Sequence, residues 1–436
     1  MARERREPVR ILIVGGGYVG LYSAMGLQRR LRNHEAEVVL VTPESFMTYQ
    51  PFLPESASGL IEPRHVVIPL RTVLTKVRLL TGIVRRLDHD RRVAAVAPIE
   101  GEPYELAYDV VVVGPGSVSR VLPVPGLAER AVGFKTVTEA IFLRNQVLSR
   151  MDVAESTEDP NVRRRALTFL FVGAGYAGVE ALAELEDLAR DACRYYRTVR
   201  RRDMRWVLVE AADGILPEIG PDLGEYAVRR LRRRDIEVKL QTRLESAERG
   251  RMVFSDGDSF DADTLVWTTG VRAHPAVARM GFTLDERGRV VADEFLRVRG
   301  VSDAWTAGDC AAIPDIITGG VTPPTAQHAL RQARRLARNV VATLRGEEPQ
   351  PFRYRQLGAL VSLGRYKGVA RVLGVRLRGF PAWFLHRTYH LSRIPTTNRK
   401  VRVMLDWTVA LFFRRDVVQL GSLQHPRDPL REATEG

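Results

Sequence analysis

Two glycine-rich segments carry the most specific chemistry of this sequence. The first, GGGYVG at 15–20, follows the apolar run 11–14 and precedes a helical pattern. The second, GAGYAG at 173–178, follows the apolar run 167–172 and precedes another helical pattern. In such a motif the first glycine permits a tight turn, the second lets the backbone approach a pyrophosphate, and the third lets the helix pack against the strand. The sequence therefore predicts two dinucleotide sites, with two tight turns that bind no ligand as the alternative.

The residues after the next strand of each copy indicate which dinucleotide binds where. In the second copy, Glu210 ends the apolar strand 206–209. A carboxylate there accepts hydrogen bonds from ribose hydroxyls and repels a 2′-phosphate, so it favours NADH over NADPH; a solvated glutamate is the alternative. In the first copy Thr42 takes that place, and Glu44 lies two residues further on. Two dinucleotides in one chain suggest a flavin and a nicotinamide, and the second copy is the candidate for the nicotinamide.

The elements around the motifs predict an α/β fold with two Rossmann-like dinucleotide-binding domains. Each copy is followed later by another apolar strand that runs toward a glycine, Gly116 or Gly270. Continuous apolar runs of this kind are typical of parallel strands that are buried on both faces. The polar segment 152–165 is expected to be a surface linker, and a helix is expected over 325–344 after two prolines. The predicted boundaries are 1–122 with 275–350 for the first domain, 123–274 for the second, and 351–436 for a C-terminal region.

The positive charge of the chain is concentrated near its C-terminal end. The sequence has 66 Lys and Arg against 52 Asp and Glu, so the net charge is 66 − 52 = +14. Residues 353–415 contain 14 of the basic residues and one acid, Asp406, so this segment alone carries 14 − 1 = +13. The rest of the chain is close to neutral. The composition, 45% hydrophobic and 27% charged, is otherwise that of a globular protein and excludes a largely disordered chain.

The basic segment also contains aromatic residues in two short amphipathic stretches that Pro395 and Asn398 separate. Neither stretch is long enough to cross a bilayer. Arginines together with interfacial aromatic residues favour a helix pair that lies on an anionic membrane surface, over about 376–415. A protein interface, such as that of a homodimer, and a nucleic-acid groove are the alternatives, and the apolar content argues against nucleic acid. The aromatic residues are Phe380, Trp383, Phe384, Tyr389, Trp407, Phe412 and Phe413.

The two cysteines exclude several kinds of chemistry. Cys193 and Cys310 are far apart in the sequence, and neither belongs to a C-x-x-C pair. A disulfide scaffold, a thiolate metal site and a dithiol relay are therefore not expected, and no metal site is predicted. The N-terminal segment has a short apolar run that does not predict a signal peptide. We expect a cytosolic compartment, with a membrane surface as a docking partner.

With these motifs the sequence resembles the two-dinucleotide-binding-domain flavoproteins related to glutathione reductase. More closely, it resembles the type II NADH:quinone oxidoreductases, which are single-subunit NADH dehydrogenases that do not pump protons. The resemblance extends over nearly the whole chain, and the combination of motifs is more specific than the glycines alone. The matching segments are Gly15 to Gly20, Tyr49-Gln50-Pro51, Gly173 to Glu180, Trp267 to Arg272, Gly308-Asp309, Ala326-Gln327-His328-Ala329 and the basic aromatic segment.

The resemblance implies an enzyme that passes a hydride from NADH to FAD and then two electrons to a membrane quinone, as a peripheral protein of the respiratory chain on the cytoplasmic side of the cell membrane. Glu180 and Gln327 are the implied catalytic residues, and Gln327 with Ala326 the implied quinone contacts. For FAD it implies Gly15, Gly17, Tyr18, Gly20, Thr42, Glu44, Gln50, Gly116, Gly308, Asp309 and Ala326. For NADH it implies Gly173, Gly175, Tyr176, Gly178, Glu180, Glu210 and Gly270.

Two departures from the family pattern keep other functions open. The family has a glycine where this chain has Ala333, and Thr42 stands where an acid is expected at the end of the second strand of the first copy. A soluble NADH-dependent reductase of a small redox protein and a non-catalytic NAD(H)-binding homologue are the alternatives. Sulfide:quinone oxidoreductases share this fold but need redox cysteines near the flavin, so Cys193 and Cys310 are interpreted as packing residues. Plain structural interpretations also remain for three of these residues. Asp309 is then a turn residue, Gln327 an amide at a helix start, and Glu180 an acid in the first helical turns.

Overall fold

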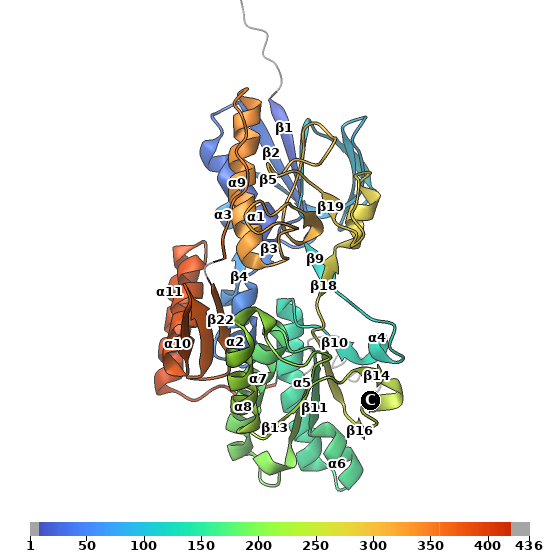
Figure 1. Cartoon of the computed structure of the whole chain (residues 1–436), viewed down its shortest axis with the longest axis vertical. Helices are drawn as coiled ribbons and strands as arrows, with labels where there is room; N and C mark the ends of the chain where they lie inside the picture. The colour runs from blue at the N-terminus through green and yellow to red at the C-terminus, as the bar shows by residue number, and fades with distance from the viewer. Residues whose placement is uncertain (1–7, 357, 420–436) are drawn as a thin grey trace, which may run out of the picture. The chain divides into compact units, whose positions relative to one another are not determined.

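The computed structural model describes residues 8–356 and 358–419 and divides the chain into two compact units (Figure 1). Within the described residues, the first unit comprises 8–48, 67–120 and 271–356, and the second unit comprises 49–66, 121–270 and 358–419. The division differs most from the predicted boundaries at residues 49–66 and in the C-terminal segment, which both cluster with the middle of the chain. Residues 271–274 and 351–356 belong to the first unit, also in contrast to the predicted boundaries.

A seven-stranded sheet with the order β20-β8-β1-β2-β5-β6-β7 forms the centre of the first unit. Strands β20, β8, β1 and β2 and the start of β5 pair in parallel, whereas β6 and β7 form an antiparallel extension on the second half of β5. The long strand β5 belongs to both parts and has a register shift between Val84 and Arg86. The strands are β1 Val9–Val14, β2 Ala36–Thr42, β5 Arg78–Asp88, β6 Val93–Pro98, β7 Tyr104–Ala107, β8 Val110–Val113 and β20 Ala304–Thr306.

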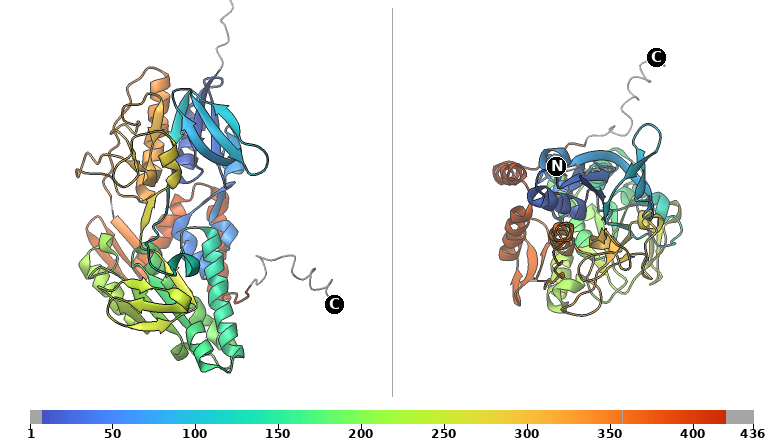
Figure 2. Two further views of the ribbon diagram at one scale, coloured as in Figure 1. Left: turned by 90° about the vertical axis from the view of Figure 1, so that its right-hand side faces the viewer. Right: turned by 90° about the horizontal axis from the view of Figure 1, so that it is seen from above.

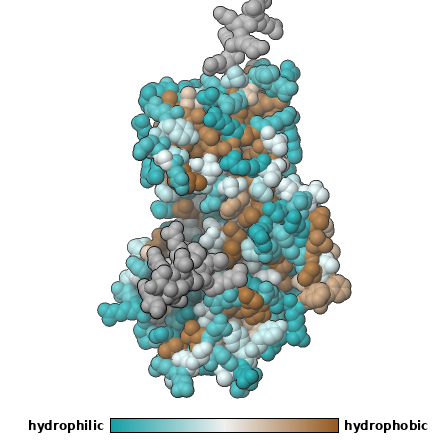
Figure 3. Space-filling view, turned by 180° about the vertical axis from the view of Figure 1, so that it is seen from behind, coloured by the Kyte–Doolittle hydropathy of each residue, from teal (hydrophilic) through white to brown (hydrophobic). Residues whose placement is uncertain are grey.

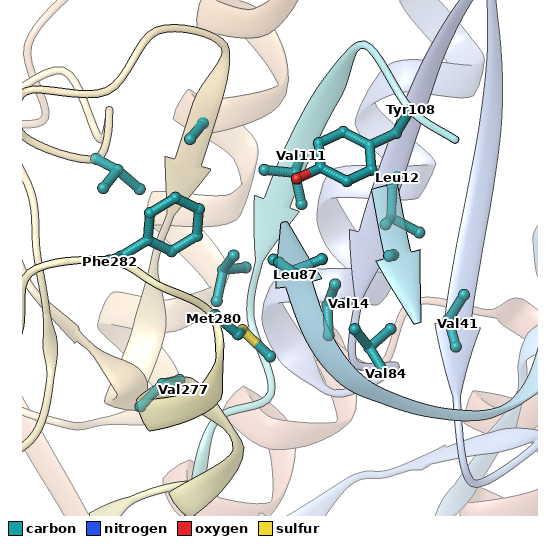
Figure 4. Close-up of a cluster of buried hydrophobic side chains, with 14 of the residues drawn as sticks. Leu12, Val14, Val41, Val84, Leu87, Tyr108, Val111, Val277, Met280 and Phe282 are labelled. Carbon is teal, nitrogen blue, oxygen red and sulfur yellow. The ribbon is translucent and has the colours of Figure 1, made fainter. Parts of the chain in front are cut away.

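Both faces of the parallel strands are buried, which explains their uninterrupted apolar sequences. Leu12 and Val14 of β1 point into a cluster that includes Val41, Val111 and Met280 (Figure 4). The alternate residues of the same strand face the other side of the sheet. There helix α1, Tyr18–Arg30, packs closely along helix α9, Ala326–Leu344 (Figure 1).

A five-stranded parallel sheet with the order β10-β17-β11-β12-β13 forms the centre of the second unit. Helix α7, Tyr176–Ala192, follows β11 directly, and helix α8, Pro221–Arg232, precedes β13. A small antiparallel sheet, β14-β15-β16, adds to this unit. The strands are β10 Ala131–Val132, β11 Thr168–Val172, β12 Arg205–Val209, β13 Ile236–Lys239, β14 Leu244–Ser246, β15 Arg251–Phe254, β16 Ser259–Asp261 and β17 Thr264–Trp267.

The prediction of a surface linker over 152–165 is wrong, because most of this segment is helical. Helix α5, Val137–Ser156, runs through its first part and is seen along its length in the left-hand view of Figure 2. Helix α6, Pro160–Ala166, follows after a short break. Asp159 accepts hydrogen bonds from the amides of Asn161 and Val162, and Pro160 occupies the first helical position, so an N-cap starts α6. These capping residues were a sequence signal for a helix, but the polar composition of the segment suggested a linker.

The C-terminal segment folds onto the second unit rather than extending from it. Residues 358–378 form an antiparallel sheet, β22-β23-β24, that the sequence did not predict. Helix α10 packs against this sheet, and α11 lies beside α10 (right-hand view of Figure 2). In the part of the chain that the structure describes, no helix has the length and apolar content needed to traverse a bilayer. The elements are β22 Gly358–Ser362, β23 Gly368–Val372, β24 Val375–Arg378, α10 Phe380–Arg393 and α11 Thr397–Phe412.

Several short strands and helices lie between the main elements of the two units. Helix α9 begins after the N-cap Thr325, so the two prolines before it lie outside the helix rather than at its first position. The short elements are β3 Phe46–Thr48, β4 Val67–Pro69, β9 Ser117–Ser119, β18 Val271–Ala273, β19 Val290–Val291, β21 Ala311–Ala312, α2 Leu53–Ala57, α3 Leu70–Val73 and α4 Leu127–Arg130.

Candidate functional site

The first glycine motif forms the turn between β1 and α1. Gly15 has φ of +98°, a conformation that disfavours side chains, and a β-carbon there would also crowd the carbonyl of Gly114. A β-carbon at Gly20 would overlap the carbonyl of Gly15, so this glycine allows the helix to approach the turn. A β-carbon at Gly17 would meet no described atom within 4 Å. The backbone at Gly17 therefore faces open space at the start of α1, where the positive end of the helix dipole favours an anion.

The second motif repeats this geometry between β11 and α7. Gly173 has φ of +103°, and a β-carbon there would crowd the carbonyl of Thr268. A β-carbon at Gly178 would overlap the carbonyl of Gly173, whereas one at Gly175 would meet no described atom within 4 Å. Tyr176 follows at the first position of α7, where burial raises the pKa of its hydroxyl. The two turns thus have the same three glycine functions, as the sequence predicted.

Thr42 and Glu210 occupy equivalent positions after the second strand of each copy. Gly15 donates its amide to Val41 O, and Gly173 donates its amide to Val209 O, at 2.8 and 2.9 Å. The carboxylate of Glu210 reaches the glycine turn and accepts hydrogen bonds from the amides of Ala174, at 2.7 Å, and Ala212, at 3.0 Å. The buried Thr42 lies against Gly16 instead, and the predicted Glu44 is exposed two residues beyond the strand.

The remaining residues predicted for the dinucleotides lie in turns that follow strands. In the first unit, Asp309 stands in a short 3-10 helix after β20 and accepts a hydrogen bond from the hydroxyl of Ser117, 2.6 Å away. Gly308 donates its amide to Oε1 of Gln332. Gly116 and Gly270 both have positive φ, and neither would meet a described atom with a β-carbon. These turns end parallel strands at the carboxyl edge of a sheet, where α/β folds bind ligands.

Gln327 lies in the first turn of α9, directly after Ala326. Its side-chain oxygen accepts a hydrogen bond from the hydroxyl of Tyr354 at 2.7 Å. In that orientation its NH2 group remains a donor, which is what a quinone carbonyl requires. Thr325 caps the helix by accepting from the amide of His328. Tyr354 is a contact that sequence reasoning missed, because 27 residues separate it from Gln327.

Glu180 is buried in the second turn of α7, and two partners from the C-terminal segment hold its carboxylate. Its Oε1 accepts a hydrogen bond from the amide of Ser362 at 2.8 Å. The same oxygen lies 3.2 Å from Nε2 of His386 on α10. The side chain of Glu180 is 8% exposed and that of His386 3% exposed, so the pair is shielded from water. No motif pointed to His386.

Further acids of the second unit form a buried network that the sequence analysis did not predict. Glu184 accepts hydrogen bonds from the hydroxyls of Ser58 and Ser362, and burial raises its pKa to about 7. Asp187 and the neighbouring Glu186 form ion pairs with the buried guanidinium of Arg234. Acids at positions 180, 184 and 187 recur at i, i+4 and i+7 on one face of an Ala-rich and Leu-rich helix, and that spacing was the available signal.

Gln50 lies in the second unit, in a short 3-10 helix before α2. Its side-chain NH2 donates to the carbonyl of Lys135 at 3.2 Å. The neighbouring Tyr49 donates its hydroxyl to the carbonyl of His390 at 3.0 Å. The segment that contains the predicted flavin contact thus binds α10 within the second unit.

The two tryptophans of the basic aromatic segment pack against the second unit instead of facing outward. Trp383 of α10 is 6% exposed, and its ring packs edge-on against that of Tyr366. Trp407 packs edge-on against Phe52 and donates its indole N–H to Oε2 of Glu55 at 2.7 Å. The guanidinium of Arg387 lies over both indole rings and binds Glu55 through two hydrogen bonds. The tryptophans therefore attach the helix pair to the unit, and the outward surface is made of other residues.

Both cysteines are free thiols. Cys310 is fully buried in the core of the first unit, and burial raises its pKa to about 11. Burial also raises the pKa of Cys193. Neither thiol is poised to ionise near neutral pH, which agrees with a packing function.

Comparison with known proteins identifies the family. Residues 9–333 match the model of the pyridine nucleotide-disulphide oxidoreductase family. The type II NADH:quinone oxidoreductase Ndh of Mycobacterium tuberculosis is 30% identical over 93% of this chain and 89% of its own length. The chain belongs to the type II NADH:quinone oxidoreductases. The Staphylococcus aureus type II NADH:quinone oxidoreductase is also 30% identical, over 89% of this chain and 94% of its own.

Membership of the type II NADH:quinone oxidoreductases confirms several predictions. The family, the α/β fold with two dinucleotide-binding domains, the FAD-dependent NADH dehydrogenase activity toward a quinone, and the cofactors FAD and NADH are those expected from the sequence. Solved structures agree in fold. NDH2 of Plasmodium falciparum, solved in complex with NADH, matches 95% of this chain and 100% of its own with a TM-score of 0.88 at 16% identity. The sulfide:quinone oxidoreductase of Aquifex aeolicus matches 94% of this chain and 96% of its own with a TM-score of 0.70 at 15% identity.

Proposed function

We propose that this type II NADH:quinone oxidoreductase holds FAD on the glycine turn at 15–20 and NADH on the turn at 173–178, and that it reduces a quinone drawn from a membrane. The observation that carries the assignment is the difference between Thr42 and Glu210 at equivalent positions. A carboxylate at the strand end accepts hydrogen bonds from the ribose hydroxyls and repels the 2′-phosphate of NADPH. Glu210 therefore supports the proposal that the second turn binds NADH.

Residues of the first unit fit FAD. The open backbone at Gly17 leaves room for a pyrophosphate, with Gly15 and Gly20 shaping the turn around it. Asp309 offers a carboxylate for hydroxyl groups of the cofactor, and Ser117 orients that carboxylate. The N-terminus of α9, at Ala326, adds a positive helix dipole that stabilises negative charge. When bound, FAD supplies hydride acceptance from NADH and electron transfer to the quinone.

Residues of the second unit fit NADH in the same manner. Gly175 has open backbone at the start of α7, and Gly270 lies in the turn after β17 of the same sheet. Glu180 and His386 form an acid–base pair in which a proton can move between Oε1 and Nε2. In this proposal Glu180 supplies or receives a proton, and the NH2 group of Gln327 binds a quinone carbonyl.

The outward face of α10 and α11 is proposed as the membrane contact. Its apolar side chains are more than 40% exposed and recur at helical spacing on α11, so this amphipathic helix turns its apolar stripe outward. Brown surface follows the right-hand edge of the lower half of Figure 3, where α11 lies. Arginine and lysine residues flank the stripe, as headgroup binding requires. The exposed residues are Phe380, Phe384, Val401, Met404, Leu405, Val409, Leu411, Phe412 and Phe413.

Location and assembly complete the proposal. We propose that the protein lies on the cytoplasmic side of the cell membrane. A homodimer stays a proposal, which size-exclusion chromatography with light scattering would report. Nucleic acid is not a proposed partner.

A flavin redox assay tests the function. The purified protein should be yellow, and anaerobic NADH should bleach its flavin absorbance. A menaquinone or ubiquinone analogue should then restore the colour within the turnover time. Reduced flavin that reacts with ferredoxin or rubredoxin and not with quinone would favour a soluble reductase, and protein that neither contains nor takes up FAD would favour a non-catalytic homologue.

A lipid assay tests the membrane contact. Leu405→Glu places a charge on the 58% exposed apolar side chain in α11 and should reduce binding to vesicles with anionic lipid at least tenfold. Ile99→Glu is the matched control, because Ile99 is an exposed apolar residue, 71% accessible, of the first unit. Equal binding by both variants would remove α11 from the contact.

A further inference from the structure

Helix α9 and the residues 352–353 form a basic cavity that the proposed electron transfer does not use. The cavity has a volume of about 190 Å³ and lies on the first unit. Phe352 forms an apolar part of its wall. The other lining residues are Arg331, Arg334, Arg335, Arg338 and Arg353.

The positive charge of this cavity has little compensation within the protein. Arg331, Arg334, Arg335 and Arg338 stand at i, i+3, i+4 and i+7, so they share one face of α9. Neither α9 nor α1 contains an aspartate or glutamate, and α1 contributes two more arginines at its C-terminal end. Among the described residues, none of the five cavity arginines forms an ion pair with a carboxylate, whereas the nearby Arg345 pairs with Glu35.

The arginines also act on one another. Burial lowers the pKa of Arg335, and the charge of Arg338 lowers it further. Arg30 on α1 has a lowered pKa because of burial and then because of Arg338 and Arg29. Arg234 of the second unit shows the contrast, since its partners Asp187 and Glu186 raise its pKa against the effect of burial. Guanidinium groups that cluster without counter-charges repel one another, which raises the free energy of the folded protein. A bound anion would reduce this repulsion.

We propose that this cavity binds a phosphate-bearing anion, either a free oligophosphate or the headgroup of an anionic phospholipid. Guanidinium groups match phosphate oxygens with paired N–H donors, and five of them exceed what one carboxylate could balance. Arg331 is already oriented, because it lies 4.1 Å over the ring of Tyr354 and donates to the carbonyl of Gln327. Such preorganisation lowers the cost of binding. The volume admits a polyatomic anion rather than a single water molecule.

Isothermal titration of the FAD-containing protein with inorganic tripolyphosphate tests the free-anion source. Binding should occur near 1:1 and should weaken at least tenfold in Arg334→Ala/Arg338→Ala, because each charged hydrogen-bonding partner contributes more than a neutral one. Both side chains are exposed, so the variant should keep its flavin absorbance and its melting temperature. The matched control is Arg164→Ala/Arg233→Ala, which removes two arginines of the second unit and should leave the affinity within twofold.

Vesicles distinguish the second source. Phosphatidylcholine vesicles with and without phosphatidylglycerol are sedimented with the same three proteins. The bound phosphate is a lipid headgroup if two results are obtained together. Tripolyphosphate does not bind, and the affinity for anionic vesicles falls at least tenfold in Arg334→Ala/Arg338→Ala but not in the control variant. The proposal is overturned if neither ligand distinguishes that variant from the unsubstituted protein, or if the control variant loses as much affinity.

Discussion

Oε1 of Glu180 lies 3.2 Å from Nε2 of His386, and both side chains are buried. Glu180 belongs to the helix that begins at the second glycine turn, whereas His386 belongs to α10 in the C-terminal segment. Helix α10, one of the two helices proposed to contact the membrane, therefore contacts α7, the helix proposed to bind NADH. The imidazole of His386 also lies against His390, with ring centroids 4.6 Å apart. An acid and an imidazole in contact can exchange a proton, and reduction of a quinone to a quinol takes up protons.

The first prediction concerns proton transfer by this pair. Glu180→Gln keeps an oxygen for the amide of Ser362 but cannot exchange a proton, so kcat for quinone reduction should fall about tenfold to a hundredfold. KM for NADH should change less than threefold. Steady-state kinetics with a quinone analogue and equal flavin content provides the measurement. Glu225→Gln on the exposed side of α8 is the control. A raised KM with unchanged kcat would instead make Glu180 a positioning residue.

The second prediction concerns nucleotide selection at Glu210. Its carboxylate lies at the glycine turn, where it accepts from Ala174 and Ala212. Glu210→Gln keeps an acceptor for one amide and removes the negative charge, so the ratio of kcat/KM for NADH over NADPH should decrease at least tenfold. Glu248→Gln, on an exposed turn of the same unit, should leave the ratio unchanged. If Glu210→Gln leaves the ratio of kcat/KM unchanged and lowers the stability, Glu210 stabilises the glycine turn and does not select the nucleotide.

The third prediction concerns the pH dependence of stability. Burial raises the pKa of Glu184 to about 7 from its ordinary value of 4.5, although the charge of Arg415 opposes this shift. The folded protein thus holds a proton that the unfolded chain releases, and the stabilisation is lost as pH rises through about 7. Between about pH 5 and pH 8 the free energy of unfolding should fall more in the unsubstituted protein than in Glu184→Gln, by on the order of 2 kcal/mol.

Urea unfolding followed by circular dichroism at both pH values measures this difference. Glu245→Gln is the control, because Glu245 is exposed in the same unit. Parallel pH profiles for the unsubstituted protein and Glu184→Gln would contradict the prediction, since they would mean that Glu184 is ionised in the folded state across the range.

The fourth prediction separates the two kinds of aromatic residue in α11. Trp407→Ala removes the packing on Phe52 and the hydrogen bond to Glu55, so it should destabilise the protein by about 2 to 4 kcal/mol. Phe412→Ala truncates a side chain that is 80% exposed and should change stability by less than about 0.5 kcal/mol. Vesicle binding should show the reverse order, with the larger loss in Phe412→Ala. Thermal unfolding and vesicle sedimentation together decide whether the tryptophan or the phenylalanine faces lipid.

Short sequence patterns correctly predicted the elements that depend only on neighbouring residues. A glycine turn between an apolar strand and a helix needs only neighbouring residues, so both motifs, their strands and the start of α9 were expected correctly. Helices α5 and α6 were missed because a polar composition suggested a linker, whereas a capping box at Thr136 and the cap at Asp159 start helices in spite of it. The sheet β22-β23-β24 was not predicted because its strands are short and two of them contain arginines.

Residue types at short fixed spacing were enough to predict the two glycine turns, the acid at Glu210 and the family. Tertiary structure alone decided which side chains meet across long separations. His386 contacts Glu180, Trp407 contacts Glu55, and Tyr354 contacts Gln327, and no pattern of spacing encodes such contacts. It also divided the basic residues by location. The charge near the C-terminal end borders an apolar face, while the arginines of α9 line a separate cavity, because folding places residues by packing and not by their order in the chain.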